Sequence, residues 1–263
     1  MTSETTSMGT SPALEHWVRL AGEHHDGAIE RFELISARRA LNLLKRNLGR
    51  ARLLELLQGE IAAGDAYLRA HVERSAGREI GGTTTLSARG LSAEQFTRWL
   101  SEAFRREDVL IAGHPEHYSI HAATGGEVNI VETLGEHVCS FFMREWDDSV
   151  LATLDPAPSE PDPPGARRSL LALEDGTIVG SISNSFEEQP GGFTARLSVS
   201  LPATCGQHVI DHHLEHFAVE FRNWILRAAA EQAAAVPTQN RPIAEAAGGT
   251  DGTSRIRPLP GLD

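Results

Sequence analysis

Two hydrophobic periods divide the chain near residue 76. Over residues 13–75, large apolar residues recur at spacings of three and four, with charged residues between them. This spacing places the apolar side chains on one face of a helix. It predicts a small helical N-terminal domain of two to four helices, with Gly49 and Gly59 as candidate breaks.

From Gly81 onward the pattern is mainly that of strands. A Thr-rich strand-like segment (81–90) precedes one helix over 91–108, which Ser92 can cap and in which Gln95 can complete a capping box. Strand patterns then follow at residues 116–123, 127–135, 138–146, 168–174, 177–188 and 193–201. Turn residues at 124–126, 175–176 and 190–192 join them into hairpins. A long amphipathic helix over about 207–234 closes the domain.

The order of these elements over residues 76–234 predicts an α+β fold. A curved antiparallel sheet would wrap around the long C-terminal helix, with an apolar cavity between them. This order resembles that of the Bet v 1/START helix-grip superfamily. Residues 154–167 are Pro-rich and predict a loop inserted between strands. Residues 1–12 and 235–263 are poor in large apolar residues and predict disordered ends.

Composition narrows the classes of function. The 263 residues carry a formal net charge of −12, which argues against a nucleic-acid partner. The basic segment 37–52 is interpreted as the solvated face of a helix. The two cysteines, Cys139 and Cys205, are too few for a disulfide framework or a thiolate zinc site. No apolar run is long enough to span a membrane and the N-terminus lacks a signal pattern, so we expect a cytoplasmic protein without a membrane partner.

The closing helix carries the sequence "DHHLEHFAVE" at residues 211–220. On a helical wheel His216 and Glu220 lie one turn apart, beside His213 and on one flank of the apolar stripe. The apolar stripe consists of Ile210, Leu214, Phe217, Phe221, Trp224 and Ala228. A pair at this spacing can form an ordinary surface hydrogen bond, or it can supply two ligands to one metal ion. Glu215 and His208 are expected to face solvent.

A second group of His and Glu residues falls on the predicted hairpin 116–135. With the turn at residues 124–127, Ser119 pairs with Glu132, and His117 and His121 share their face. This face would look into the cavity, although an edge strand with solvated side chains is the alternative. The two groups together predict a metal site of His117, Glu132, His216 and Glu220, suited to zinc, or to iron or manganese. His121 and His114 are the other candidates for the first histidine.

These four residues, within "HPEHY", "VETLG" and "HFAVEF", resemble the metal set of the 2,4-diacetylphloroglucinol hydrolase and phloretin hydrolase-like family. The resemblance implies a zinc-dependent hydrolase that cleaves the carbon–carbon bond between an acyl group and a polyphenol-like ring. Ring protonation would need a general acid, for which His121, His213 and Glu187 are candidates. By analogy, the N-terminal helices could form a homodimer or cap the cavity.

The competing hypothesis is a metal-free helix-grip protein. Its cavity would bind an apolar, polyketide-like ligand, or the protein would be a polyketide cyclase. The fold is compatible with both hypotheses. They differ in whether the two His and two Glu side chains meet.

Overall fold

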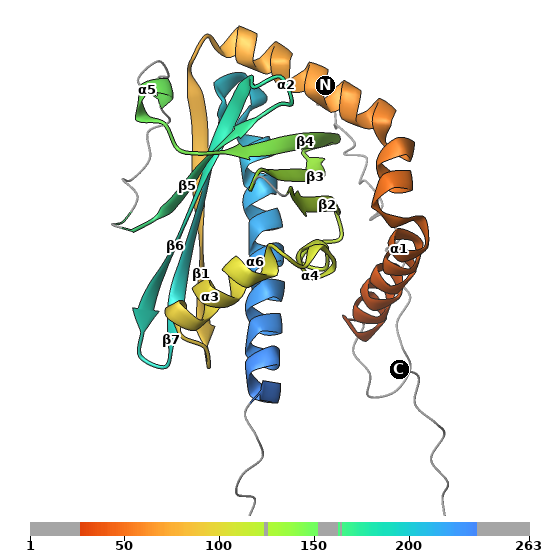
Figure 1. Cartoon of the computed structure of the whole chain (residues 1–263), viewed down its shortest axis with the longest axis vertical. Coiled ribbons are helices and arrows are strands. Elements are labelled where there is room, and N and C mark those ends of the chain that lie inside the picture. Colours follow the sequence, from red (N-terminus) through yellow and green to blue (C-terminus); the bar gives the residue numbers. More distant parts are fainter. Residues whose placement is uncertain (1–26, 124–125, 152–162, 164, 236–263) are drawn as a thin grey trace, which may run out of the picture.

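The computed structural model describes residues 27–123, 126–151, 163 and 165–235. One antiparallel sheet with strand order β1-β7-β6-β5-β4-β3-β2 curls around the long helix α6 (Gln207–Ala235) (Figure 1). Its strands are β1 (Glu79–Arg89), β2 (His117–Ala122), β3 (Val128–Leu134), β4 (His137–Arg144), β5 (Arg167–Ala172), β6 (Ile178–Gln189) and β7 (Gly192–Pro202). This is the helix-grip arrangement that the element order predicts.

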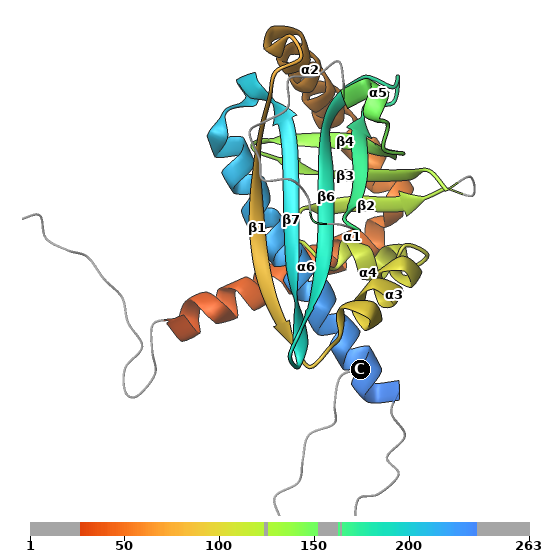
Figure 2. The same cartoon turned by 90° about the vertical axis from the view of Figure 1, so that its left-hand side faces the viewer.

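The two halves of the sheet run in different directions. Figure 2 shows the long strands β1, β7 and β6 side by side, with β2, β3 and β4 lying across the upper part of α6. In β7 buried and half-buried residues alternate, because one face of the strand packs in the core and the other is partly open to water. Helix α6 can approach β1 closely at Gly82, where a Cβ atom would lie 2.8 Å from Ile210 Cγ2.

Two helices between β1 and β2 close one side of the core. Helix α3 (Ala93–Ala103) begins at Ser92, whose hydroxyl accepts from the backbone of Gln95 while the Gln95 side chain accepts from Ser92, which confirms the predicted capping box. The short helix α4 (Glu107–Ile111) follows and contacts β2. The apolar stripe predicted for α6 is also confirmed, since all its members but the half-buried Leu214 are buried.

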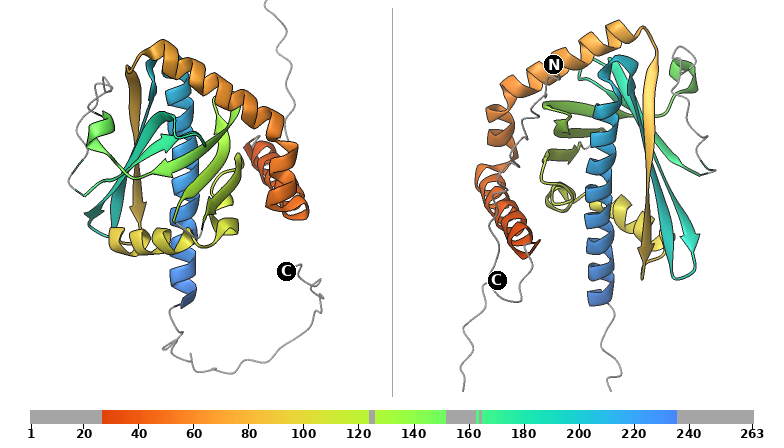
Figure 3. Two further views of the ribbon diagram at one scale, coloured as in Figure 1. Left: turned by 45° about the horizontal axis from the view of Figure 1, so that its top comes forward. Right: turned by 180° about the vertical axis from the view of Figure 1, so that it is seen from behind.

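The N-terminal helices lie on one side of this core. Helix α2 (Gln58–Ser75) packs on β4 and the one-turn helix η1 (Ala203–Cys205), and α1 (Gly27–Leu56) continues past β2 (Figure 3). Gly49 interrupts α1 with a φ of 68°, at one of the two predicted breaks. No residue of α1 is buried, so this helix contributes little to the core.

Other predictions have different outcomes. The strands agree with prediction to within a few residues, whereas α4 and α5 (Asp148–Leu151) were not predicted. The ends 1–12 and 236–263, and most of the Pro-rich loop, lie outside the described residues. No helix in the described part of the chain combines the length and the apolar character needed to cross a membrane.

Candidate metal centre

The predicted hairpin register is wrong by one residue. Strand β2 has an irregularity between His117 and Ser119, so His117 pairs with Glu132, and Ser119 pairs with Val131. An extra residue in one strand moves the side chains beyond it to the opposite face. His117 therefore shares a face with Glu132, while Ser119 and His121 face away from the cavity, toward Arg50 and Glu107.

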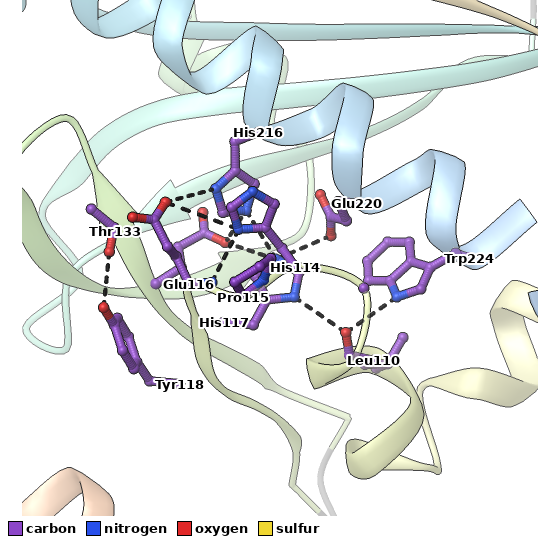
Figure 4. A network of polar contacts seen from close by, with 12 residues as sticks. Leu110, His114, Pro115, Glu116, His117, Tyr118, Thr133, His216, Glu220 and Trp224 are labelled. Atoms are coloured by element: carbon purple, nitrogen blue, oxygen red, sulfur yellow. Dashed lines mark hydrogen bonds and ion pairs between the residues drawn. The ribbon is translucent and has the colours of Figure 1, made fainter. Parts of the chain in front are cut away.

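His117, His216 and Glu220 point toward one another between this hairpin and α6 (Figure 4), and Glu132 lies within ion-pair distance of both histidines. His117 Nε2 lies 3.0 Å from His216 Nε2 and 3.5 Å from Glu132 Oε2. It also lies 3.7 Å from Glu220 Oε1, and His216 Nε2 lies 3.5 Å from Glu132 Oε2. Two ligands of a tetrahedral zinc ion at 2.0–2.2 Å are about 3.3–3.6 Å apart. These four separations, 3.0–3.7 Å, are close to that spacing, and His117, His216 and Glu220 form one cluster of potential metal ligands.

All four side chains are buried: His117 is 0% exposed, His216 3%, and Glu132 and Glu220 each 7%. Burial lowers the pKa of His117 to about 3 and strongly lowers that of His216, so both imidazoles are neutral at pH 7. Burial also raises the pKa of Glu132 to about 8 and that of Glu220 well above its ordinary value. A divalent cation would offset the cost of ionising the two buried carboxyl groups, and the two neutral imidazoles could bind it through their lone pairs.

The tautomer of His117 is set by the backbone. His117 Nδ1 donates to the carbonyl of Leu110 at 3.2 Å, and Trp224 Nε1 donates to the same oxygen at 3.2 Å. A neutral imidazole that donates through Nδ1 has a lone pair on Nε2. This lone pair points at His216 and the two carboxyl groups. Metal-binding histidines commonly have such a hydrogen bond on the other ring nitrogen.

The segment before β2 is held by α1. Lys45 Nζ donates to the carbonyls of Pro115 and His117, at 2.6 Å each. Burial lowers the pKa of Lys45 to about 8. The N-terminal helix thereby fixes the backbone at His117, the first predicted ligand. The sequence around Lys45 does not indicate that its partner lies about seventy residues away.

Two further groups surround His216. The ring of His114 stacks on it with centroids 3.7 Å apart, and Glu116 Oε2 lies 4.0 Å from His216 Nδ1. His114, Glu116 and His216 form a second cluster of potential ligands. His114 was predicted as a lesser candidate and lies against the site without joining the four donors. Glu116 was not predicted, although its place between two candidate histidines was a signal for it.

The three general-acid candidates lie in different places. His213 is buried at 3% exposure and lines the cavity beside His216, with ring centroids 5.4 Å apart. Burial lowers its pKa to about 4. The side chain of His121 is 43% exposed, and Glu187 is exposed near the β6–β7 turn. The structure thus brings only His213, of these three, to the cavity.

A cavity of about 160 Å³ is lined by two of the four predicted ligands, Glu132 and Glu220. A cavity of this size holds a ligand of about one benzene ring. Glu132, Glu220 and His213 lie in its wall, and most of the remaining lining is apolar: Leu100, Phe104, Ile120, Ile130, Phe141, Met143, Leu171, Ile182, Leu197, Phe217, Phe221 and Trp224. Among the buried residues of β7, Leu197 lines the cavity, whereas Phe193 and Val199 do not.

No family model matches the chain, and no curated protein matches it. Solved structures do match. Ara h 8.0201 is 11% identical, with 58% of this chain and 99% of that chain covered and a TM-score of 0.38. A START superfamily protein from Mycobacterium smegmatis is 15% identical, with 59% and 98% covered and a TM-score of 0.36. An AHSA1-like protein from Aeromonas hydrophila is 13% identical, with 58% and 94% covered and a TM-score of 0.30. At these identities the likeness concerns the fold alone.

Proposed function

We propose that the protein is a metal-dependent hydrolase that cleaves the bond between an acyl group and a polyphenol-like aromatic ring. The observation that carries the proposal is the convergence of buried donor atoms from His117, Glu132, His216 and Glu220. The two glutamates also line an apolar cavity. The resemblance of these residues to the metal set of the 2,4-diacetylphloroglucinol hydrolase family supplies the reaction type. Zinc is the expected ion, with iron or manganese as alternatives.

The donor set fits a divalent cation. The Nε2 atoms of His117 and His216 are 3.0 Å apart, and the Nδ1–H of His117 is already used by Leu110. With both rings neutral, there are two possible arrangements. Either His216 has its only N–H on Nε2 and donates to His117 Nε2, or it has the N–H on Nδ1 and the two Nε2 lone pairs face each other. In the second arrangement a cation that accepts both lone pairs would remove their repulsion. A zinc ion held there would supply hydroxide by lowering the pKa of bound water to about 7.

The chain's own residues would perform the remaining steps. The apolar wall would hold the ring and exclude water, which strengthens polar interactions near the four donors. The aromatic carbon leaves only after it has gained a proton. His213 is the candidate at the cavity. Because burial keeps its imidazole neutral at pH 7, it would act as a relay, taking up the proton that the attacking water loses and delivering it to the ring carbon.

Metal analysis tests the proposal. The protein is purified without chelator and its metal content is measured by mass spectrometry, beside a His216→Ala/Glu220→Ala variant. We expect near-stoichiometric metal in the wild type and loss in the variant. His208→Ala/Glu215→Ala is the matched control, because both residues are exposed on the same helix. Release of carboxylic acid from acylphloroglucinols by the loaded protein then tests the reaction. A folded wild type that binds no metal would favour a metal-free ligand-binding protein or cyclase.

A homodimer through the N-terminal helices is part of the proposal. Helix α1 exposes several large apolar side chains: Ile29, Phe32, Leu34, Ile35, Leu43, Leu44 and Leu56. Several large apolar side chains exposed on one helix are more than the scattered single ones that need no explanation, and they are candidates for an interaction site. A second copy of the chain would bury it. Light scattering should report a dimer for the wild type and a monomer after Phe32→Glu/Leu44→Glu.

A further inference from the structure

Four polar residues lie in the cavity wall besides Glu132, Glu220 and His213: Arg167, Ser169, Ser183 and Asn184. Arg167 of β5 and Asn184 of β6 are directly paired, so their side chains leave the same face of the sheet. Both line the cavity that Glu132 and Glu220 also line. The proposed metal site comes from β2, β3 and α6, so this pair is a separate polar feature of the same cavity.

The amide of Asn184 lacks a partner. Its Oδ1 atom is shielded from solvent and has no hydrogen-bond partner among the described residues. A buried polar group without a partner costs free energy, and native structures contain few of them. Because Oδ1 is an acceptor, a carboxylate cannot satisfy it directly. A 180° turn of the amide would instead aim the Nδ2–H donors into the cavity that Asn184 lines, where a ligand carboxylate could accept from them.

Arg167 adds a positive charge beside this amide. Its side chain is exposed and donates to Ser101 Oγ at 3.3 Å, a contact with a neutral group. Over residues 27–123, 126–151 and 165–235, no carboxylate lies within ion-pair distance of Arg167. The neighbouring Arg168 differs, because its guanidinium lies over the Trp146 ring at 5.1 Å. Arg168 also does not line the cavity, so it serves as a matched control.

We infer that Arg167 and Asn184 form an anion subsite that binds a carboxylate of the ligand. The guanidinium would supply charge and paired N–H donors, and the amide would donate one further hydrogen bond. The substrate class then becomes an acylated aromatic acid. Its acyl carbonyl would face the four buried donors and its carboxylate would face β5 and β6. The inference rests on the proposed function only in assigning this cavity to the substrate.

Calorimetric titration of the metal-free protein in EDTA tests the subsite. The probes are 4-acetylbenzoate and 4-nitroacetophenone, which have the same shape because a nitro group replaces the carboxylate. We expect wild-type protein to bind the carboxylate at least about tenfold more tightly than the nitro compound, as for hydrogen bonds to a charged group. Arg167→Met should abolish this preference. Asn184→Leu should weaken carboxylate binding about fivefold, and Arg168→Met should bind both probes like the wild type.

Several outcomes would overturn the subsite. They are equal affinity of the wild type for the two probes, failure to bind either at millimolar concentration, an unchanged preference in Arg167→Met, and an equal loss in Arg168→Met. Since Arg167 is exposed, its substitution does not threaten folding, and circular dichroism checks the Asn184 variant. Binding in EDTA requires neither metal nor catalysis. Loss of the proposed hydrolysis would therefore leave this result unaffected, and the two failures can be distinguished.

Discussion

Replacing Glu132 with Gln should have opposite effects on the protein with and without metal. In EDTA the folded wild type buries a carboxyl group whose pKa burial raises from its ordinary value of 4.5 to about 8. The native state therefore holds this proton more tightly than the unfolded state. The contribution of Glu132 to the free energy of unfolding is most favourable below pH 4.5, falls as the pH rises toward 8, and then levels off.

The size of the effect follows from this shift. Between pH 4.5 and pH 7 the unfolded chain loses this proton while the native protein keeps it. Each of these about 2.5 pH units lowers the free energy of unfolding by about 1.36 kcal/mol. Glu132→Gln keeps the shape and removes the titration. In EDTA at pH 7 the variant should be more stable than the wild type by about 3 kcal/mol, with little difference near pH 4. With zinc the order should reverse, because saturation at one thousand times the dissociation constant adds about 4.1 kcal/mol to the wild type only.

Urea unfolding at pH 4, 5, 6, 7 and 8, with and without zinc, measures both effects. Glu136→Gln is the matched control, since this acid is exposed at the end of β3 and should change neither curve. A Glu132→Gln variant no more stable than the wild type in EDTA at pH 7 would refute the electrostatic reasoning. A zinc-induced gain equal to that of the wild type would refute the role of Glu132 as a ligand.

Three further predictions concern the framework around the site. Glu231 accepts hydrogen bonds from Arg227, Trp99 and Arg106, which lower its pKa to about 2. Glu231→Gln should therefore remove about 1 kcal/mol of stability at pH 7, and progressively less as the pH falls from 4.5 toward 2, as measured by urea unfolding. Gly64→Ala would place a Cβ atom 2.1 Å from the carbonyl oxygen of Val138 and should lower the melting temperature by several degrees, whereas Gly59→Ala in the same helix meets nothing within 4 Å and should not. Lys45→Met removes the donor to the carbonyls of Pro115 and His117 and should weaken zinc affinity about tenfold, as measured by competition with a chelator. Arg46→Met, at the exposed neighbouring position, should leave zinc affinity unchanged.

Sequence reasoning predicted the helix half of the site more accurately than the strand half. His216 and Glu220 are four residues apart on a regular helix, where spacing alone fixes which side chains meet. His117 and Glu132 were both chosen correctly as members of the cluster, but through a wrong register. The irregularity at Tyr118 has no local signature in the sequence, and it moved His121 from the predicted cavity face to the other side.

Contacts between distant segments account for the rest. The hydrogen bonds of Lys45 to the backbone of β2 and the pairing of Arg167 with Asn184 join residues that no local pattern connects. The helix-grip fold itself was predictable, because turn residues and changes of period mark its elements one after another. Which polar side chains share the cavity depends on sheet curvature and strand register, and these are properties of the assembled core.

The irregularity in β2 also affects how distant relatives should be compared. It lets the first histidine lie one residue farther from the following hairpin than a regular strand would require. In a relative with a regular strand, the equivalent imidazole would come from the neighbouring position in the alignment. A search with fixed spacing between this histidine and the glutamate of β3 would then miss proteins that place the same atoms in the same positions. Such comparisons need a gap at Tyr118 or a superposition of side chains.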